Sequence, residues 1–262
     1  MTSFNDFNAD EWKESEILTD SLWVIPERDK SGKHNGFYHG NFIPQIPHQL
    51  ILRYTKKNDV VFDAFVGSGT TVFESETLKR KCIGVDIQQE LITYIDNQLE
   101  EESRLDTELI VGDSTKPETY SKVGEALKRF KKEKVDLAIL HPPYADIVKF
   151  SNLDDDLSNS KSLNEFIEKF TQVLKHTTEI LHDGRYLVIV IGDKYTQGQW
   201  IPLGFYCMNA AQKCGLTLKS IVIKNMEGNR AKQNKTSIWR YRALKSDYYI
   251  FKHEYILVFK KP

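Results

Sequence analysis

The sequence predicts an α/β fold with a mostly parallel sheet and helices on both faces. Short apolar segments alternate with stretches of helical periodicity from about residue 47 onward, which is the pattern of parallel strands joined by crossover helices. The apolar run at 185–191 is unbroken, as in a strand buried on both faces. Seven strands are expected, at 59–63, 81–86, 109–111, 135–140, 185–191, 216–223 and 254–260.

Helices are expected between these strands. One begins at Pro47, two more cover 70–79 and 88–102, and another covers about 202–213. Apolar residues between 163 and 181 recur at helical spacing, so that helix should pack one face on the sheet. In such folds a ligand binds beyond the carboxyl ends of the strands.

Composition excludes several classes of protein. The chain has 262 residues, 40% hydrophobic and 28% charged, which fits a globular protein with one large domain. Its three cysteines indicate no disulfide framework and fit a reducing cytoplasm. No apolar run reaches the ~18 residues needed to span a membrane, and the first residues do not form a secretory signal. The net charge of −1 disfavours non-specific coating of nucleic acid.

Two glycines follow the first expected strand, in Asp63-Ala-Phe-Val-Gly-Ser-Gly-Thr-Thr71. Glycine allows a sharp strand-to-helix turn and lets a ligand approach the main chain; an ordinary turn would also use it. Asp86 ends the second strand, where a carboxylate can accept hydrogen bonds from a ribose. Asp113 follows the third strand and could bind an adenine amino group. The turn lacks the further glycine of a dinucleotide site, so a nucleoside without bulky phosphates fits it better.

The fourth expected strand is followed by His141-Pro142-Pro143-Tyr144. The two prolines fix the backbone and remove two amide donors, which leaves neighbouring carbonyls as acceptors. A rigid acceptor edge followed by an aromatic ring fits a flat heterocycle with an exocyclic amino group. A proline turn that only ends the strand is the alternative at this point.

From about residue 42 to 262 the chain resembles the amino-group DNA methyltransferases. Asp63–Thr71 is similar to their cofactor motif Asp-Pro-Phe-x-Gly-Ser-Gly-Thr-Thr, and His141–Tyr144 to their Asp/Asn/Ser-Pro-Pro-Tyr signature. Ile43–Leu50 resembles the segment before the cofactor motif, and Phe251–Phe259 the final strand. The order of the motifs is that of the gamma class, although the Gly-Ser-Gly-Thr-Thr wording is commoner in the beta class.

The resemblance implies a Rossmann-like fold, S-adenosyl-L-methionine as cofactor, and direct methyl transfer to adenine N6 or cytosine N4, with adenine slightly favoured. It implies that position 141 and the Pro142 carbonyl accept hydrogen bonds from the amino group while Tyr144 stacks on the flipped base. No metal ion is expected. The implied cofactor residues are Asp63, Phe65, Gly67, Gly69, Thr70, Asp86, Ile87 and Asp113, and the implied catalytic residues are His141, Pro142, Pro143 and Tyr144.

Three features depart from the family pattern. His141 stands where the family has Asp, Asn or Ser. A neutral imidazole offers one acceptor nitrogen and a protonated one offers none, so activity is expected to fall at acidic pH. Ala64 replaces the usual proline of the cofactor motif. The chain also has no room for a large target-recognition domain.

A basic insertion at about 224–247 is the candidate for substrate contact. From 219 to 245 the chain has eight Lys and Arg residues against the single acid Glu227, and interleaved aromatic residues suit a phosphate backbone and unstacked bases. A solvated loop between the last two strands is the alternative. The candidate nucleic-acid-binding residues are Arg230, Lys232, Lys235, Trp239, Arg240 and Arg242.

We expect residues 42–262 to form the methyltransferase domain, and residues 1–41 an N-terminal extension whose aromatic residues cover the active site. The expected partner is DNA, in a cytoplasmic restriction-modification setting without membrane contact. Two alternatives stand beside it: an RNA base methyltransferase, and a cofactor-binding subunit that is non-catalytic or depends on a partner. The sequence leaves open a homodimer and a separate specificity or nuclease partner.

Overall fold

The structure is a computed structural model that describes residues 4–34, 38, 40–143, 157–196, 198–226 and 236–262. The strands are β1 (Leu22–Trp23), β2 (Val60–Asp63), β3 (Lys81–Asp86), β4 (Thr107–Val111), β5 (Val135–Leu140), β6 (Leu181–Ile191), β7 (Lys194–Thr196), β8 (Gln199–Ile201), β9 (Thr217–Asn225) and β10 (His253–Lys260). The α-helices are α1 (Gln45–Tyr54), α2 (Thr70–Thr77), α3 (Gln89–Gln98), α4 (Pro117–Arg129), α5 (Leu163–Ile180), α6 (Leu203–Lys213) and α7 (Thr236–Leu244). Short 3₁₀ helices are η1 (Ala9–Glu14), η2 (Ser103–Leu105) and η3 (Leu157–Asn159).

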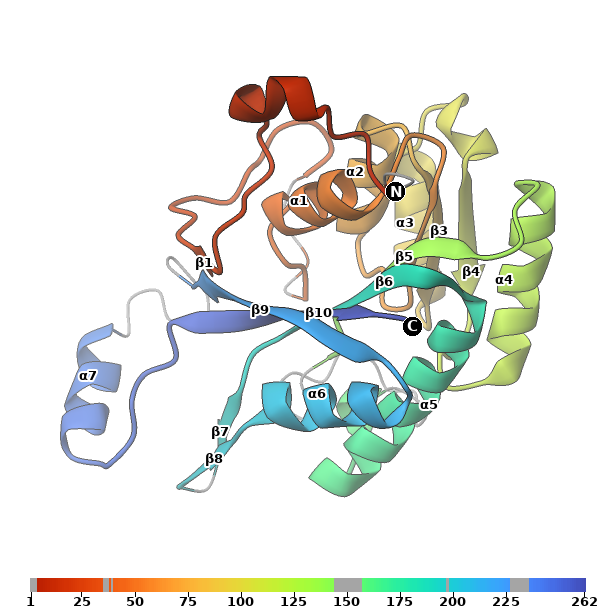
Figure 1. Cartoon of the computed structure of the whole chain (residues 1–262). Helices are drawn as coiled ribbons and strands as arrows, with labels where there is room; N and C mark the ends of the chain where they lie inside the picture. The colour runs from red at the N-terminus through yellow and green to blue at the C-terminus, as the bar shows by residue number, and fades with distance from the viewer. Residues whose placement is uncertain (1–3, 35–37, 39, 144–156, 197, 227–235) are drawn as a thin grey trace.

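The main sheet has eight strands in the order β1-β9-β10-β6-β5-β2-β3-β4, and β7 and β8 form a separate hairpin (Figure 1). Strands β4, β3, β2, β5 and β6 are parallel, while β10 runs antiparallel to both β6 and β9. The expected mostly parallel sheet is confirmed, but the expected number of seven strands is wrong. The eighth strand, β1, comes from the N-terminal extension and pairs Leu22 with Ile223 of β9.

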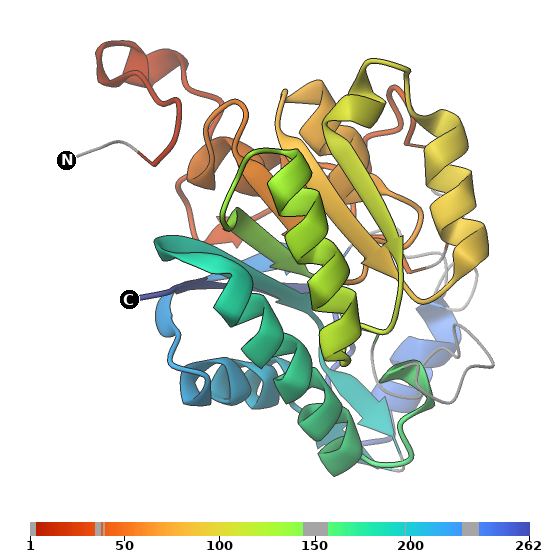
Figure 2. The same cartoon turned by 90° about the vertical axis from the view of Figure 1, so that its right-hand side faces the viewer.

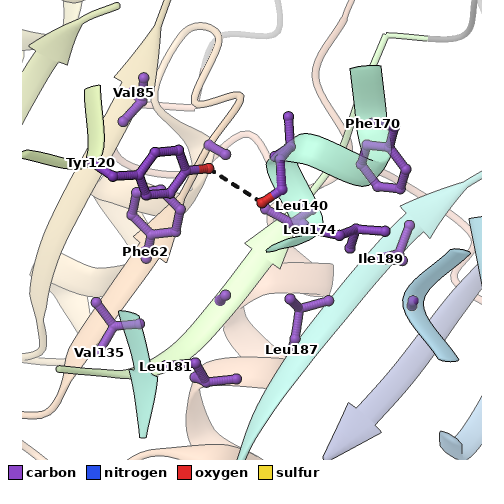
Figure 3. Packing of buried hydrophobic residues seen from close by; sticks show 14 of the residues in the cluster. Phe62, Val85, Tyr120, Val135, Leu140, Phe170, Leu174, Leu181, Leu187 and Ile189 are labelled. Atoms are coloured by element: carbon purple, nitrogen blue, oxygen red, sulfur yellow. Dashed lines mark hydrogen bonds between the residues drawn. The ribbon is translucent and has the colours of Figure 1, made fainter. Parts of the chain in front are cut away.

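Helices cover both faces of this sheet. Figures 1 and 2 show α1, α2 and α3 on one face and α4, α5 and α6 on the other. The larger core lies under the second group, where α5 buries Phe166, Phe170 and Leu174 against the central strands (Figure 3). On the opposite face α1 buries Ile46 and Leu50. The periodic apolar positions of α5 therefore pack on the sheet as the sequence predicts.

The N-terminal extension lies against the α1 face. Asp6 accepts a hydrogen bond from the buried Arg80 at 2.8 Å, and Asn5 donates one to the backbone oxygen of Arg53 at 2.8 Å. Phe4 packs against the rings of Tyr54 and Tyr186. These contacts join residues far apart in sequence, so the extension is held to the domain from its first described residues. No helix in the described parts of the chain is long and apolar enough to cross a membrane.

Two elements differ from the sequence-based expectation. Part of the basic insertion expected at about 224–247, for which no helix was expected, forms helix α7, which lies beyond the end of the sheet (Figure 1). The β7–β8 hairpin follows β6 directly and was not expected. The carboxyl ends of β2, β3, β4, β5 and β6 meet at one edge of the sheet because these strands are parallel, and the candidate site is built there.

Candidate active site

Asp63 ends β2 and organises the turn that follows. Its buried carboxylate accepts hydrogen bonds from the Thr71 hydroxyl at 2.5 Å and from the backbone N–H of Phe65 at 2.9 Å. Burial raises the pKa of Asp63 to about 7, although both hydrogen bonds act in the opposite direction. Each carboxylate oxygen already has a donor inside the protein. We therefore expect Asp63 to hold the shape of the turn rather than to contact a ligand.

The turn between β2 and α2 requires glycine at two positions. Gly67 and Gly69 have φ values of +54° and +92°, a region that other residues rarely occupy. A Cβ atom on Gly69 would lie 2.9 Å from Cγ1 of Ile95 in α3. Helix α2 then begins at the buried Thr70. The amino end of α2 thus opens directly onto the carboxyl edge of the sheet.

Asp86 ends β3 and supports the same turn. One carboxylate oxygen accepts the backbone N–H of Gly67 at 3.0 Å, and the other accepts the N–H of Gln88 at 2.9 Å. Ile87, between Asp86 and Gln88, is half-buried. Unlike the buried Asp63, Asp86 is half-buried, and a carboxylate oxygen can accept more than one hydrogen bond. This is the arrangement that a ribose diol needs.

Asp113, after β4, has partners within its own turn. Its carboxylate accepts hydrogen bonds from the backbone N–H and the hydroxyl of Thr115, both at 2.8 Å. Ser114, which the sequence patterns did not single out, donates to the backbone oxygen of Ala64 at 2.7 Å. The turn after β4 is therefore tied to the turn after β2. At the start of α4, the backbone oxygen of Asp113 accepts hydrogen bonds from the N–H of Lys116 at 3.1 Å and the hydroxyl of Thr119 at 2.7 Å.

The N-terminal extension reaches this turn through Tyr38 and Asn41. A Cβ atom on Gly67 would lie 3.2 Å from Oδ1 of Asn41 and 3.3 Å from Cε1 of Tyr38. The Tyr38 hydroxyl accepts a hydrogen bond from the Gln88 side chain at 3.4 Å, and Asn41 donates to the Ser68 hydroxyl. Sequence reasoning considered only the aromatic residues of the extension as a group. The contacts of Asn41 and Gln88 depend on tertiary packing and left no signal in the sequence.

His141 and Pro142 follow β5 next to the glycine turn. The half-buried imidazole of His141 packs against the ring of Phe42, with 4.9 Å between ring centroids. Burial lowers the pKa of His141 to about 4, and the nearby Lys224 lowers it further while Glu254 acts in the opposite direction. The imidazole is therefore neutral at pH 7, the state in which one ring nitrogen is an acceptor. Pro142 is buried and Pro143 half-buried.

Lys224 of β9 and Glu254 of β10 form a buried ion pair near His141. The two residues are register partners, and Nζ of Lys224 lies 2.9 Å from Oε1 of Glu254. Both side chains are less than one-tenth exposed. An unpaired buried charge would strongly shift the pKa of a neighbouring imidazole. The two charges of an ion pair act on that pKa in opposite directions, so their combined effect is smaller. The pair thus keeps the surroundings of His141 close to neutral.

The candidate nucleic-acid-binding residues are described only in part. Trp239, Arg240 and Arg242 lie on α7, and the guanidinium of Arg242 lies 5.5 Å from the centre of the Trp239 ring. Arg240 and Arg242 are exposed. Four predicted site residues, Tyr144, Arg230, Lys232 and Lys235, lie outside the described residues.

The chain matches one known protein family over most of its length. The sequence profile of the N6/N4 DNA methylases, described as "DNA methylase", matches residues 5–97 and 135–262. The chain belongs to this DNA methylase family. The family's cofactor is S-adenosylmethionine. The match includes the glycine turn, Asp86 and His141, whereas Asp113 falls in the unmatched segment.

Curated relatives match this chain over part of their length. The chain is 36% identical over 78 residues to the type II methyltransferase M2.LlaDCHI of Lactococcus lactis subsp. cremoris. This match covers 30% of this chain and 29% of that protein. The chain is 28% identical over 159 residues to the tRNA (guanine(10)-N2)-dimethyltransferase of Methanocaldococcus jannaschii, covering 60% of this chain and 40% of that one. The match thus spans less than half the length of either relative.

Solved structures share the fold of the DNA methylase. The [4+2]-cyclase SpnF superposes with a TM-score of 0.55 at 13% identity, covering 92% of this chain and 86% of that one. A SAM-dependent methyltransferase from Methanosarcina mazei superposes with a TM-score of 0.51 at 12% identity, and the match covers 81% of this chain and 96% of that one. At these identities the likeness concerns the fold alone. The predicted Rossmann-like methyltransferase fold is confirmed.

Proposed function

We propose that this DNA methylase transfers a methyl group to the exocyclic amino group of a DNA base, adenine N6 or cytosine N4. The observation that carries the proposal is the neutral His141 followed by two prolines, beside the glycine turn. Strands β2 and β5 are neighbours, and Asp63 is the register partner of Ile139. The turn after β2 and residues 141–143 therefore leave adjacent strands at the same edge of the sheet.

The residues at the turn fit the nucleoside part of S-adenosylmethionine. Asp86 is half-buried at this turn, where its carboxylate would accept hydrogen bonds from the ribose hydroxyls. Phe65 lies next to this turn and is half-buried. Tyr38 and Asn41 contact the same turn, so we assign these two residues of the extension the role of covering the cofactor. When bound, S-adenosylmethionine supplies a methyl group activated by a positively charged sulfur.

His141 and the Pro142 carbonyl would act on the target amino group. The lone pair of this nitrogen is delocalised into the ring of the base, so the amine is a poor nucleophile. Two acceptors that bind its hydrogens favour a tetrahedral nitrogen with a localised lone pair, and fixed acceptors stabilise the charge that develops there. A neutral imidazole meets this need, whereas an imidazolium has no acceptor. The neutral state of His141 at pH 7 is thus the feature that makes it a working substitute for Asp, Asn or Ser.

The basic helix α7 favours a nucleic-acid substrate, and the match to the DNA methylase family favours DNA. Arg240 and Arg242 are exposed on it, and the described residues of α7 include no acid. Cations on one helix attract a phosphate backbone and position it without reading its sequence. RNA is a second candidate, because the match to the tRNA methyltransferase extends over 159 residues, against 78 for the Lactococcus type II enzyme.

A labelling experiment tests the proposal. Purified protein is incubated with methyl-labelled S-adenosylmethionine and either DNA or RNA, and the nucleosides are analysed by mass spectrometry. We expect label on N6-methyl-deoxyadenosine or N4-methyl-deoxycytidine. Label only on a ribonucleoside would replace DNA by RNA, and cofactor binding without labelled nucleoside would indicate a partner-dependent or non-catalytic subunit. Comparison with His141→Asp separates two further cases: higher activity in the variant indicates a site weakened by histidine, and lower activity a site adapted to it.

A further inference from the structure

The β7–β8 hairpin leaves the sheet beside the candidate active site. Leu140 at the end of β5 is the register partner of Ile189 in β6, so the residues after β5 and those after β6 lie at the same edge. The hairpin begins at Lys194, three residues after β6 ends. Figure 2 shows it at the carboxyl end of β6, on the side where α7 lies. The hairpin therefore leaves the sheet at the same edge as His141.

Asp193 fixes the hairpin to the rest of the domain. Its carboxylate accepts hydrogen bonds from the indole N–H of Trp200 in β8 at 3.0 Å and from the Tyr255 hydroxyl in β10 at 3.1 Å. It also accepts the backbone N–H of Gly204 in α6 at 3.1 Å. One carboxylate thus joins the hairpin, a helix and a central strand. The Asp193 charge, after burial, also helps to raise the pKa of Tyr255 to about 12, so Tyr255 stays protonated and remains a donor.

Aromatic residues join the hairpin to the segment between α7 and β10. Trp200 packs on Phe251 with 4.1 Å between ring centroids, and Tyr195 packs on Tyr248 at 4.4 Å. These pairs do not bury the whole surface. Trp200 remains 37% exposed, and Tyr249, which stands between Tyr248 and Phe251 in the sequence, is 86% exposed.

Cations border this aromatic surface on the α7 side. Nζ of Lys245 lies 4.9 Å from the ring of the exposed Tyr241, and Arg242 lies over Trp239. Asp247 is an exposed acid in the same segment. Exposed aromatic rings beside flexible cations are the combination with which proteins bind unstacked nucleotides: the rings stack on bases and the cations contact phosphates.

We propose that Trp200 and Tyr249 form a stacking surface for nucleotides that flank the target base in DNA, and that Asp193 is the positioning residue that holds this surface beside the active site. The inference rests on the proposed function, because it assigns the hairpin to the same substrate. It gives the described domain its own means of contacting bases. The order of the elements favours DNA with an extruded base, since the surface adjoins the position where that base would be held.

The test compares Trp200→Ala with Trp12→Ala in the full-length protein. Trp12 is 63% exposed on η1, so the control removes an exposed tryptophan away from the proposed surface. We expect Trp200→Ala and Tyr249→Ala each to raise the dissociation constant for DNA and KM for DNA about ten-fold, the scale of one lost stacking contact. The dissociation constant for S-adenosylmethionine should not change. Trp12→Ala should leave all three values unchanged.

Salt dependence separates stacking from phosphate contact. We compare the slope of the logarithm of the DNA-binding constant against the logarithm of the salt concentration. Removing a stacking residue should leave this slope unchanged, whereas Arg242→Gln should reduce its magnitude by about 1. Equal DNA affinity for Trp200→Ala, Tyr249→Ala and Trp12→Ala overturns the stacking surface while leaving DNA methylation intact. If the unchanged protein neither binds nor methylates DNA, the proposed function fails and this inference fails with it.

Asp193 is tested through Trp200→Phe, which retains an aromatic ring but lacks the indole N–H. Asp193→Asn and Trp200→Phe should each raise KM for DNA with little change in kcat. The KM of the double variant should be no higher than that of the more impaired single variant. A purely structural role would instead lower the melting temperature without changing KM, and independent effects in the double variant would contradict positioning. If Asp193→Asn fails to fold, Trp200→Phe alone decides the point: a raised KM for DNA supports positioning through the indole N–H, and a KM equal to that of the unchanged protein overturns it.

Discussion

The carboxylate of Asp86 accepts a hydrogen bond from the backbone N–H of Gly67 at 3.0 Å, which joins the end of β3 to the turn after β2. The proposed function gives Asp86 a second role, to accept hydrogen bonds from a ribose. The two roles make different demands on the side chain. The turn after β2 needs one acceptor oxygen, toward Gly67, while the other oxygen accepts the N–H of Gln88. A ribose diol would benefit from the negative charge.

Asp86→Asn separates these roles, because asparagine retains one acceptor oxygen and loses the charge. We expect the variant to fold normally and to bind S-adenosylmethionine about 10–100-fold more weakly, since a hydrogen bond to a charged group contributes about 1.5–3 kcal/mol. Titration calorimetry measures the affinity. Asp113→Asn is the matched control and should have a smaller effect, because that carboxylate already bonds to Thr115. Equal losses in both variants would contradict the assignment.

Protonation of His141 should set the pH below which activity falls. Its pKa of about 4 keeps the imidazole neutral down to about pH 5, so kcat/KM for the nucleic acid should be level from pH 8 to about pH 5 and fall below it. His141→Asn retains an acceptor and does not titrate, so its profile should lack the part of the fall that His141 causes. A fall centred near pH 6.5 in the unchanged protein would show that burial does not lower the pKa of this histidine.

The same shift has a consequence for stability. The pKa of His141 is lower in the folded protein than its ordinary value of 6.5, so the unfolded chain binds more protons between these values. The contribution of His141 to folding is therefore complete above about pH 6.5 and declines as the pH falls toward 4.

Gly69 and Gly124 should respond in opposite ways to alanine. Gly69 has a φ of +92°, and a Cβ atom there would lie 2.9 Å from Ile95, so Gly69→Ala should lower the free energy of unfolding by about 1–3 kcal/mol or more. Gly124 lies within α4, and a Cβ atom there would have nothing within 4 Å. Gly124→Ala should raise the free energy of unfolding by up to about 1 kcal/mol. Urea unfolding measures both, and a neutral Gly69→Ala would show that the turn does not need a left-handed residue.

His48 should stabilise the fold mainly at mildly acidic pH. The buried Glu74 lies 2.7 Å from the ring nitrogens of both His34 and His48. Its hydrogen bond raises the pKa of His48 above 6.5. Burial would raise the pKa of Glu74, but the two histidines outweigh burial and lower it below 4.5.

The signs of these two shifts define a pH window. The raised pKa of His48 gives a stabilisation that is complete below 6.5 and is lost as the pH rises through the folded-state pKa. The lowered pKa of Glu74 also stabilises the folded protein. This stabilisation is complete above pH 4.5 and is lost as the pH falls through the folded-state pKa of Glu74. His48→Gln should therefore lower the free energy of unfolding by about 1 kcal/mol more at pH 6 than at pH 9. His176→Gln is the control, because its contact with Glu179 is long, at 3.8 Å, and that glutamate is exposed. The same loss at both pH values would contradict the ion pair.

Local patterns were enough to predict the sheet and the edge that carries the site. The apolar segments ending at Asp63, Asp86 and Leu140 are recognisable because strand burial repeats within a few residues. The glycine turn and the two prolines are recognisable because backbone geometry restricts those residue types. Strand β1 was missed, since two residues carry no periodicity and Leu22 pairs with Ile223, far along the chain.

The sequence by itself determined the α/β class, the order of the strands along the chain, and the position of Asp86 and His141 at strand ends. Only the tertiary structure decided what surrounds them. The pKa of His141 depends on burial beside Phe42 and on the Lys224–Glu254 pair, and the hairpin depends on Asp193 meeting Trp200 and Tyr255. Strand ends follow from interactions between near neighbours, whereas burial and charge pairing at a site arise from residues that only folding brings together.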